Sequence, residues 1–457
     1  MILSLFSAIA LAVAAFSYPP LMACLYILCS ANETAGVGGA LGIGPLPYAL
    51  GPLCFISTLI SFGKIWRERN TDRSTRRIAL LAAVALVGSC WVALAAYALT
   101  GNFRTVFFSL FNSGMYGLVI ALAYRRARPA QIMFGALLIA QLLLCLLVTV
   151  FNSGWMKIFD AARYIGALEG TDYTTGFGIS GENIYRISGQ FSNPVQLAFY
   201  GSIGILVGGW LLATQRLFGR IAGGVILALA AWVTYYTIER AILLGLVVAL
   251  FVFLYRVPVA PRRKWVWVSR SVTAIVVIGC ILYLLPPQLL RLPTSVLTIA
   301  TFFSQLGSSS EYAYRVEAFT ASVNLIGDHP LFGMGTFDNM FGELGVMPHQ
   351  AMLAWSAISG IPAGICCTLL LWLGLAATFA TRRQIVAAWA SPFTGLSLMF
   401  GWVVLAMAIS NGMSAGMFGW VCLGIAALAW AELPVVDAPV AVQSQPLTAV
   451  SRVGAAR

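Results

Sequence analysis

The chain has 457 residues, of which 60% are hydrophobic and 9% are charged, and its mean hydropathy is +0.89. Soluble domains carry about 25% charged residues, so this composition excludes an ordinary soluble protein. Apolar runs of about 20 residues, the length that crosses a bilayer as a helix, recur from end to end of the sequence. We therefore expect an all-α polytopic membrane protein.

Two further features of composition narrow the class. The nine cysteines all lie in apolar runs and lack the spacing of zinc ligands, so we expect them to be small buried hydrophobic residues. The formal net charge of +12 would suit a nucleic-acid partner. The basic residues gather on alternate connections between apolar runs, however, which favours a membrane topology without nucleic acid.

Hydropathy predicts about twelve membrane-spanning helices. They cover residues 2–29, 44–63, 78–99, 105–123, 130–151, 194–214, 219–238, 241–256, 265–286, 351–379, 388–409 and 412–431. A signal peptide has a basic start and a shorter apolar core than the first run, so that run is predicted to be a retained span. Residues 1–432 would form the transmembrane domain, and residues 433–457 a disordered cytoplasmic tail.

The connections between these spans alternate in charge. One side carries 20 of the 27 basic residues with four acidic residues, and the other carries seven basic and eleven acidic residues. Because cytoplasmic loops are rich in Lys and Arg, the first side is predicted to be cytoplasmic, together with both termini. The opposite side has two longer segments, 152–193 and 287–350. Helices are expected within them at 155–170 and 308–327, and function is expected on that side.

Arg240 is the first candidate for a functional role. Between Arg220 and Arg256 the only charged residues are Glu239 and Arg240, so two short spans must turn at the outer interface. An ionisable residue at that depth usually faces a partner or a water-filled cavity. Arg240 could hold an anion at the level of lipid headgroups. The alternatives are an arginine that reaches towards water and a contact with Glu239.

Two more arginines lie on the same predicted side. Arg186 stands shortly before Asn193 and Pro194, where free N–H groups at the start of a helix would form an anion site with it. A capped helix start with an exposed arginine explains the same residues. Arg315 lies inside the expected outer helix beside Glu311 and Glu317, and its spacing favours a solvated ion pair.

Both histidines of the chain lie between residues 322 and 364. His329 precedes Pro330 in a turn rich in proline and glycine, so a structural role in that turn is expected. His349 stands at the outer mouth of the tenth span, where a neutral imidazole can accept a proton from a hydroxyl. An interfacial histidine without a special role is the alternative. No DxD, HExxH or nucleotide-binding motif occurs, so neither a metal nor a nucleotide donor is indicated.

Four passages resemble the superfamily of bacterial O-antigen ligases and O-antigen polymerases. They are RISGQFSNPVQLA from Arg186, TIERAILLGL around Arg240, YRVEAFTASVNLIGDHPLFGMG from Tyr314, and HQAMLAWSAISGIPAG from His349. The last is similar to the ligase pattern of His, then Asn, Ser or Gln, nine residues, Gly, two residues and Gly. Here Ala363 takes the place of the second glycine and Gly364 follows it. Glu239 replaces a small residue that relatives often have before the arginine.

The resemblance implies a GT-C-like membrane glycosyltransferase of the bacterial inner membrane, inverting and independent of metals and cofactors, with its active site in the periplasm. The donor would be a glycan on undecaprenyl pyrophosphate, and the acceptor a sugar hydroxyl of lipid A–core oligosaccharide. Arg186 and Arg240 would hold the pyrophosphate, with Arg315 assisting. His349 would be the catalytic base, and Arg240 would also stabilise the leaving group.

Three other functions share some of these features. A polymerase that joins lipid-linked repeat units would handle the pyrophosphate in the same way, and so would an O-oligosaccharyltransferase that modifies proteins. A transporter or flippase would instead show internal repeats, paired broken helices and charges in the middle of its spans. The predicted spans carry no such charges, which disfavours transport.

Overall fold

The computed structural model describes residues 13, 16–31, 46–150, 194–214, 217–237, 239–256, 261–284, 309–345, 348, 350–380, 394–411 and 416–431. These residues are mostly helical and contain no β-strand, which confirms the all-α prediction for this part of the chain. The surface helix expected at 155–170 and the tail at 433–457 lie outside it.

Each of the twelve predicted apolar ranges contains at least part of a helix. In the first half of the chain these helices are α2 (Pro19–Ala31), α4 (Leu46–Glu68), α5 (Arg73–Thr100), α6 (Phe103–Ser113), α7 (Gly117–Ala123) and α8 (Arg128–Val150). In the second half they are α10 (Pro194–Thr214), α11 (Leu217–Thr237), α12 (Arg240–Arg256), α13 (Pro261–Leu284), α17 (Ala351–Ser359), α18 (Ile361–Leu375), α20 (Thr394–Asn411) and α21 (Gly416–Ala431). Two more helices, α15 (Ser309–Asp328) and α16 (Phe337–Leu344), lie in the predicted outer segment 287–350. A short 3-10 helix, Ala376–Phe379, continues α18.

Six helices in the described part of the chain are long and apolar enough to cross a membrane. They are Arg73–Thr100, Arg128–Leu147, Val195–Leu212, Leu217–Tyr235, Pro261–Ile281 and Ile361–Phe379. The apolar stretches of α12, α20 and α21 are shorter. The protein is therefore a multi-helix membrane protein, and twelve crossings remain a prediction.

The structure corrects three predicted boundaries. The span at 105–123 is two helices, because Gly114 adopts a left-handed conformation (φ 58°) that ends α6. The connection at 64–77 is mostly helical, since α4 extends to Glu68 and α5 begins at Arg73. The span at 351–379 is divided at Gly360 into α17 and α18, so the candidate span itself begins at Ile361.

The tightest helix pair is the hairpin of α10 and α11, which meet along small residues. Gly201, Gly204 and Gly208 lie on one face of α10, at the spacing of a small-residue seam. A Cβ atom at Gly208 would lie 2.6 Å from the Leu227 nitrogen and 2.8 Å from the Gly223 carbonyl oxygen. Only glycine therefore permits the backbones of the two helices to approach this closely.

Buried apolar side chains from helices throughout the chain form one large core. Six cysteines in the described part of the chain are buried, as expected, but Cys90 and Cys280 are exposed. The expectation of burial is wrong for these two, because an apolar run predicts contact with lipid as readily as contact with protein.

Connections that were predicted to share the cytoplasmic side contact one another. Arg126, between α7 and α8, forms an ion pair of 3.3 Å with Asp72, between α4 and α5. The Arg256 guanidinium at the end of α12 donates to the Ala380 carbonyl oxygen (3.4 Å), which follows α18. These contacts favour the predicted grouping of basic connections. We call the end of the molecule that carries these connections the basic end.

Helix α5 joins the basic end to the opposite end. Its first residues lie beside Asp72, whose carboxylate caps the helix by accepting the Thr75 N–H (2.6 Å). Its last turns lie against the turn that contains Gly335, because a Cβ atom on that glycine would lie 3.1 Å from the Ala95 carbonyl oxygen. Gly101, in a left-handed conformation, ends the helix. Residues 330–335 therefore lie at the end of α5 that is opposite the basic end of the molecule.

The Asp72 cap makes a testable contribution to stability. Asp72→Ala should lower the free energy of unfolding by about 1 kcal/mol, whereas Asp72→Asn should keep most of it because asparagine also caps helices. Thermal unfolding of the purified protein at neutral pH measures both. An Ala variant as stable as the wild type would contradict the capping role.

The same cap predicts a pH dependence. The Thr75 backbone N–H, and more weakly Arg126, hold the pKa of Asp72 below its ordinary value. The Asp72 carboxylate therefore contributes its full stabilisation of the folded protein above the unfolded-state pKa of about 3.9. This contribution is lost as the pH falls through the lower pKa of the folded state. In acid, the wild type and Asp72→Ala should converge in stability.

Candidate functional site

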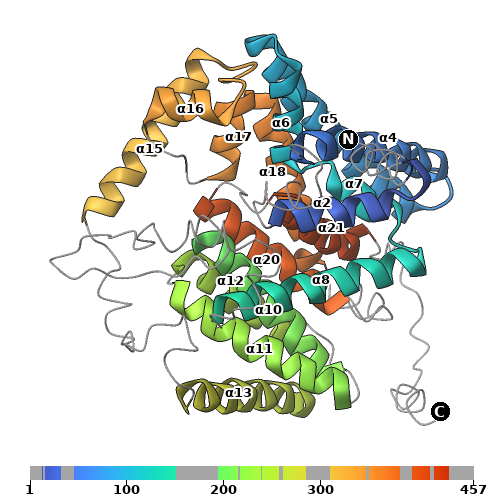
Figure 1. Cartoon of the computed structure of the whole chain (residues 1–457), viewed down its shortest axis with the longest axis vertical. Coiled ribbons are helices and arrows are strands. Elements are labelled where there is room, and N and C mark those ends of the chain that lie inside the picture. The colour runs from blue at the N-terminus through green and yellow to red at the C-terminus, as the bar shows by residue number, and fades with distance from the viewer. Residues whose placement is uncertain are drawn as a thin grey trace, which may run out of the picture.

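Helices around the predicted site gather at one corner of the molecule. Figure 1 shows α15, α16 and α17 together there, with α5 and α6 beside them. Residues 329–336, the passage HPLFGMGT, connect α15 to α16. Side chains of Leu325, Met340 and Ala357 form a small buried cluster that joins α15, α16 and α17.

The break between α17 and α18 depends on Gly360. Its backbone has φ 84° and ψ 169°, a conformation that side-chain-bearing residues rarely adopt. A Cβ atom there would also collide with the Leu331 carbonyl group. Because Gly360 has no side chain, residues 330–335 can pack directly against the backbone at this position.

Residues 330–335 hydrogen bond to the break through backbone groups. The Met334 N–H donates to the Ala357 carbonyl oxygen (2.9 Å), and the Gly335 N–H to the Ile358 carbonyl oxygen (2.7 Å). In return, the Ile361 N–H donates to the Pro330 carbonyl oxygen (2.8 Å). We call residues 330–335 and 357–361, joined in this way, the backbone clamp. The clamp thus provides partners for two carbonyl oxygens at the end of α17 and for one N–H at the start of α18, which have no partner within their own helix.

Trp91 of α5 fastens the backbone clamp to the helical core. Its indole N–H lies 3.1 Å from the Leu331 carbonyl oxygen and 3.0 Å from the Ser359 carbonyl oxygen, one on each half of the clamp. Its ring stacks on Phe332, with centroids 5.5 Å apart. Trp91 thus links a candidate membrane span to both segments.

The displaced glycine of the ligase-like pattern has a structural explanation. Ala363 is fully buried, so its methyl group is accommodated. At Gly364, by contrast, a Cβ atom would collide with the Ser356 hydroxyl and lie 3.0 Å from the Met352 carbonyl oxygen. Position 364 is thus a point of close contact between α18 and α17. In this chain the second glycine of the pattern therefore performs a packing role at 364.

The structure places the start of α17 but not the imidazole that precedes it. His349 lies outside the described residues, between the buried Pro348 and Gln350. Gln350 occupies the N-cap position of α17, and its carbonyl oxygen accepts the Ala354 N–H (2.8 Å). His349 therefore directly precedes a helix whose other end is held by the backbone clamp. Its proposed role as a base remains a prediction.

Arg315 lies near the start of α15. It shares a face of that helix with Ala318, Ser322 and Leu325, because these positions follow a spacing of three and four residues. The last three are buried, whereas Arg315 and Glu317 are exposed. Arg315 thus extends the face of α15 that packs on the protein, and Val316, Phe319 and Val323 form a different, exposed face.

Arg240 is the first residue of α12, and its side chain lies outside the described part of the chain. Helix α12 packs along α20, where a Cβ atom on Gly245 would lie 2.6 Å from the Ala406 side chain. Helix α17 packs on α20 as well. Helix α20 is therefore a common neighbour of α12, which begins with Arg240, and α17, which follows His349 in the sequence. Glu239 is buried beside Arg240.

Other predicted positions are only partly described. Arg186 lies outside the described residues, although α10 begins at Pro194 as expected. His329 is exposed and its carbonyl oxygen accepts the Gly333 N–H (3.0 Å), which confirms its place in the turn. Within the described residues, no three His, Cys, Asp or Glu side chains gather as metal ligands would.

Trp355 was not anticipated from the sequence. It is 8% exposed, on α17, and its indole N–H has no acceptor among the residues that the structure describes. Buried donors rarely lack a partner, so a ligand or another part of the chain is expected to supply one. In the sequence Trp355 is one of many aromatic residues in apolar runs, and only its burial distinguishes it.

The protein-family comparison supports the resemblance suggested by the sequence. Residues 225–368 match the model of the Wzy_C family, described as O-Antigen ligase. The matched region contains Arg240, Arg315, His349 and the whole backbone clamp, whereas Arg186 precedes it. This match confirms the predicted link to the O-antigen ligase superfamily and supports glycosyl transfer of the ligase and polymerase type. No curated protein matches the chain significantly.

The backbone clamp can be tested with one pair of glycine variants. Gly360→Ala should destabilise the protein by more than about 2 kcal/mol, from backbone strain and lost hydrogen bonds. The control is Gly342→Ala in α16, where a Cβ atom meets nothing within 4 Å. That change should be neutral or stabilise by about 0.5–1 kcal/mol, because alanine favours a helix. Thermal unfolding compares the two, and equal midpoints would contradict the clamp.

Proposed function

We propose that the protein is an O-antigen ligase. It transfers a glycan from undecaprenyl pyrophosphate to a sugar hydroxyl of lipid A–core oligosaccharide, on the periplasmic face of the bacterial inner membrane. The reaction inverts the anomeric centre and uses neither a metal nor a nucleotide. The observation that carries this proposal is the family match over residues 225–368, which spans three of the four predicted site residues.

The arrangement around α17 supports a catalytic role for His349. The residue precedes a short helix whose far end is fixed by the backbone clamp and, through Trp91, by α5. Catalytic groups act best when rigid surroundings hold their geometry. We therefore propose that the fixed position of α17 orients His349, which precedes that helix in the sequence.

The proposed reaction is a single displacement. The His349 imidazole takes the proton of the acceptor hydroxyl as its oxygen attacks the anomeric carbon of the donor sugar. The bond from that carbon to the phosphate oxygen breaks, and undecaprenyl pyrophosphate leaves with the bonding electrons. Attack opposite the leaving group inverts the anomeric configuration.

Arginine residues would stabilise the charge on the leaving pyrophosphate. Arg186 and Arg240 bind its oxygens through their planar forks, which match phosphate geometry. Arg315 approaches from α15, on the face of that helix that packs on the protein. Such donors act most strongly where charge develops in the transition state. The donor already carries an activated anomeric bond, so the arginines suffice without a nucleotide.

The side of the membrane follows from the distribution of charge. The backbone clamp lies at the end of α5 opposite the Asp72 cap and the basic end. If the basic end is cytoplasmic, His349 and the arginines of the site face the periplasm. A carrier-linked glycan displayed in the periplasm is the donor that such a site would meet.

A reconstituted reaction tests the proposal directly. The purified protein is placed in liposomes with undecaprenyl-pyrophosphate-linked glycan and offered lipid A–core oligosaccharide. Glycan attached to lipid A–core is the expected product. Elongation of the glycan on its carrier would instead identify a polymerase, and transfer to neither acceptor would reject glycosyl transfer from this donor.

The two histidines provide a matched pair of variants. His349→Ala should lower the rate of transfer by about 10²–10⁴, the usual contribution of a general base. His329→Ala should keep nearly full activity, because that imidazole is exposed in a turn. Both proteins should be expressed at the same level. A fully active His349→Ala enzyme would remove the general-base proposal.

Arg240 is tested by a change that keeps its charge. Arg240→Lys should lose most activity, since lysine offers a point charge without the planar fork. Arg104→Lys serves as the control, because Arg104 is exposed in α6 and lies outside the region that matches the family. Transfer rates at saturating donor measure both variants. Near-native activity of Arg240→Lys would assign that arginine to packing.

A further inference from the structure

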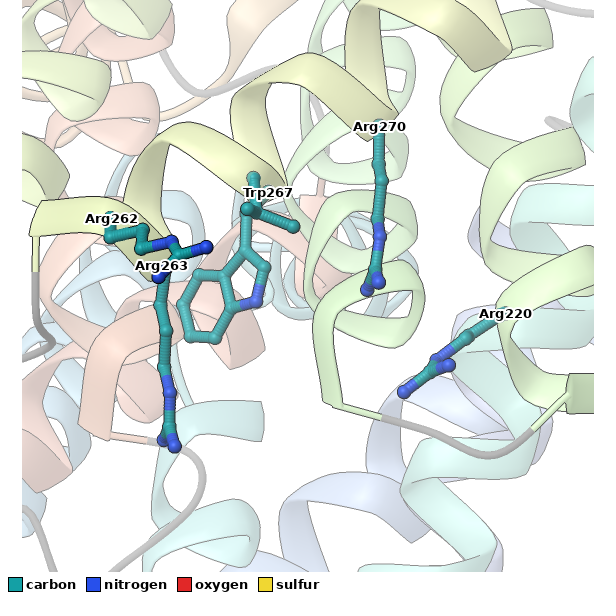
Figure 2. A pocket seen from close by; sticks show the side chains of 6 residues that line it. Arg220, Arg262, Arg263, Trp267 and Arg270 are labelled. Atoms are coloured by element: carbon teal, nitrogen blue, oxygen red, sulfur yellow. The ribbon is translucent and has the colours of Figure 1, made fainter.

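A cavity lined by four arginines lies between α11 and α13. Its volume is about 500 Å³, and its lining comprises Arg220, Arg262, Arg263, Val266, Trp267 and Arg270. Figure 2 shows Arg270 and Arg220, from different helices, extending into the same space. Arg263, Trp267 and Arg270 occupy one face of α13, at a spacing of four and three residues. We call this cavity the arginine pocket.

Among the described residues, those that line the arginine pocket include no acidic side chain to balance its charge. Within the described part of the chain, none of the four arginines forms an ion pair. Lys264, in the same stretch, behaves differently, because its amine donates to the Leu254 carbonyl oxygen. Like charges gathered on neighbouring turns repel one another, so an anion that binds all four is strongly favoured.

The surroundings of the pocket favour a lipid over a soluble anion. Beyond Arg270, the exposed residues Val277 and Ile281 continue its face of α13, which is itself a candidate membrane span. Trp267 packs on Phe253 of α12, with ring centroids 5.8 Å apart, and forms an apolar wall beside the arginines. Tryptophan is typical of the membrane interface. A headgroup at the arginines would thus have its acyl chains along exposed apolar surface.

We propose that the arginine pocket binds the phosphate groups of an anionic phospholipid. The pocket belongs to the basic end, so the lipid comes from the leaflet that is predicted to be cytoplasmic, where anionic headgroups gather around basic residues. Basic cavities between helices on that side hold lipids with phosphate headgroups, and two phosphates suit four guanidinium groups. The bound lipid fills the gap between α11 and α13. This site is separate from the periplasmic glycosyl-transfer site.

Native mass spectrometry of the full chain in detergent measures this binding. The wild type is titrated with cardiolipin, phosphatidylglycerol and phosphatidylcholine, and the two anionic lipids should bind more tightly. Arg220→Gln/Arg270→Gln should weaken cardiolipin binding roughly 30-fold, at about 1 kcal/mol for each arginine. Arg76→Gln/Arg128→Gln removes two exposed arginines near the same end, outside the pocket, and should bind as the wild type does.

Three results would overturn the proposal. They are equal cardiolipin binding by Arg220→Gln/Arg270→Gln and the wild type, equal binding of phosphatidylcholine, and displacement of cardiolipin by inorganic pyrophosphate at the same phosphate concentration. The last would identify a site for soluble anions. The single variants Arg220→Gln and Arg270→Gln decide the matter if the double variant fails to fold. Each should weaken binding roughly fivefold, and a wild-type affinity for both would reject the site.

Discussion

The hydrogen bonds between residues 330–335 and 357–361 are the constraint on which the site depends. They fasten the turn after α15 to the break after α17 through main-chain groups, so the connection does not depend on the identity of most side chains. Gly360 makes this approach possible, and Trp91 joins both segments to α5. One small backbone motif therefore fixes α15, with Arg315, and α17, which follows His349, relative to a helix that reaches from one end of the molecule to the other.

The two ends of the molecule then have different electrostatic character. At the basic end, arginines pair with Asp72, cap carbonyl groups near Ala380, or line the cavity between α11 and α13. At the opposite end, fewer basic residues are predicted, and Arg186, Arg240 and Arg315 among them are proposed to act together with His349. In the functions proposed for the two ends, a lipid would be held on one side of the membrane and a lipid-linked glycan would react on the other. Both proposed sites would use arginine forks, which suit phosphate oxygens.

Hydropathy located most of the apolar helices that the structure describes, because an apolar run long enough to cross a bilayer has few other stable structures. It did not predict the short helix α16. The small-residue seam of Gly201, Gly204 and Gly208 was not predicted, and it became evident only from the packing of α10 on α11. The break at Gly360 could not be predicted in this way, since residues 351–379 form a continuous apolar run. The break is formed by contact with the turn at residues 330–335, some 30 residues earlier in the chain. A hydropathy profile cannot show a contact between residues so far apart in the sequence. The convergence of Arg186, Arg240 and His349 depends on packing of the same kind.

That convergence is the central claim, and a structure of the protein in a lipid nanodisc with a non-reactive donor analogue tests it most directly. The pyrophosphate oxygens should lie about 2.7–3.2 Å from the guanidinium nitrogens of Arg186 and Arg240. The His349 imidazole should face the anomeric carbon from the opposite side. A pyrophosphate held at Arg220 and Arg270, or an imidazole turned away from the donor sugar, would contradict the account.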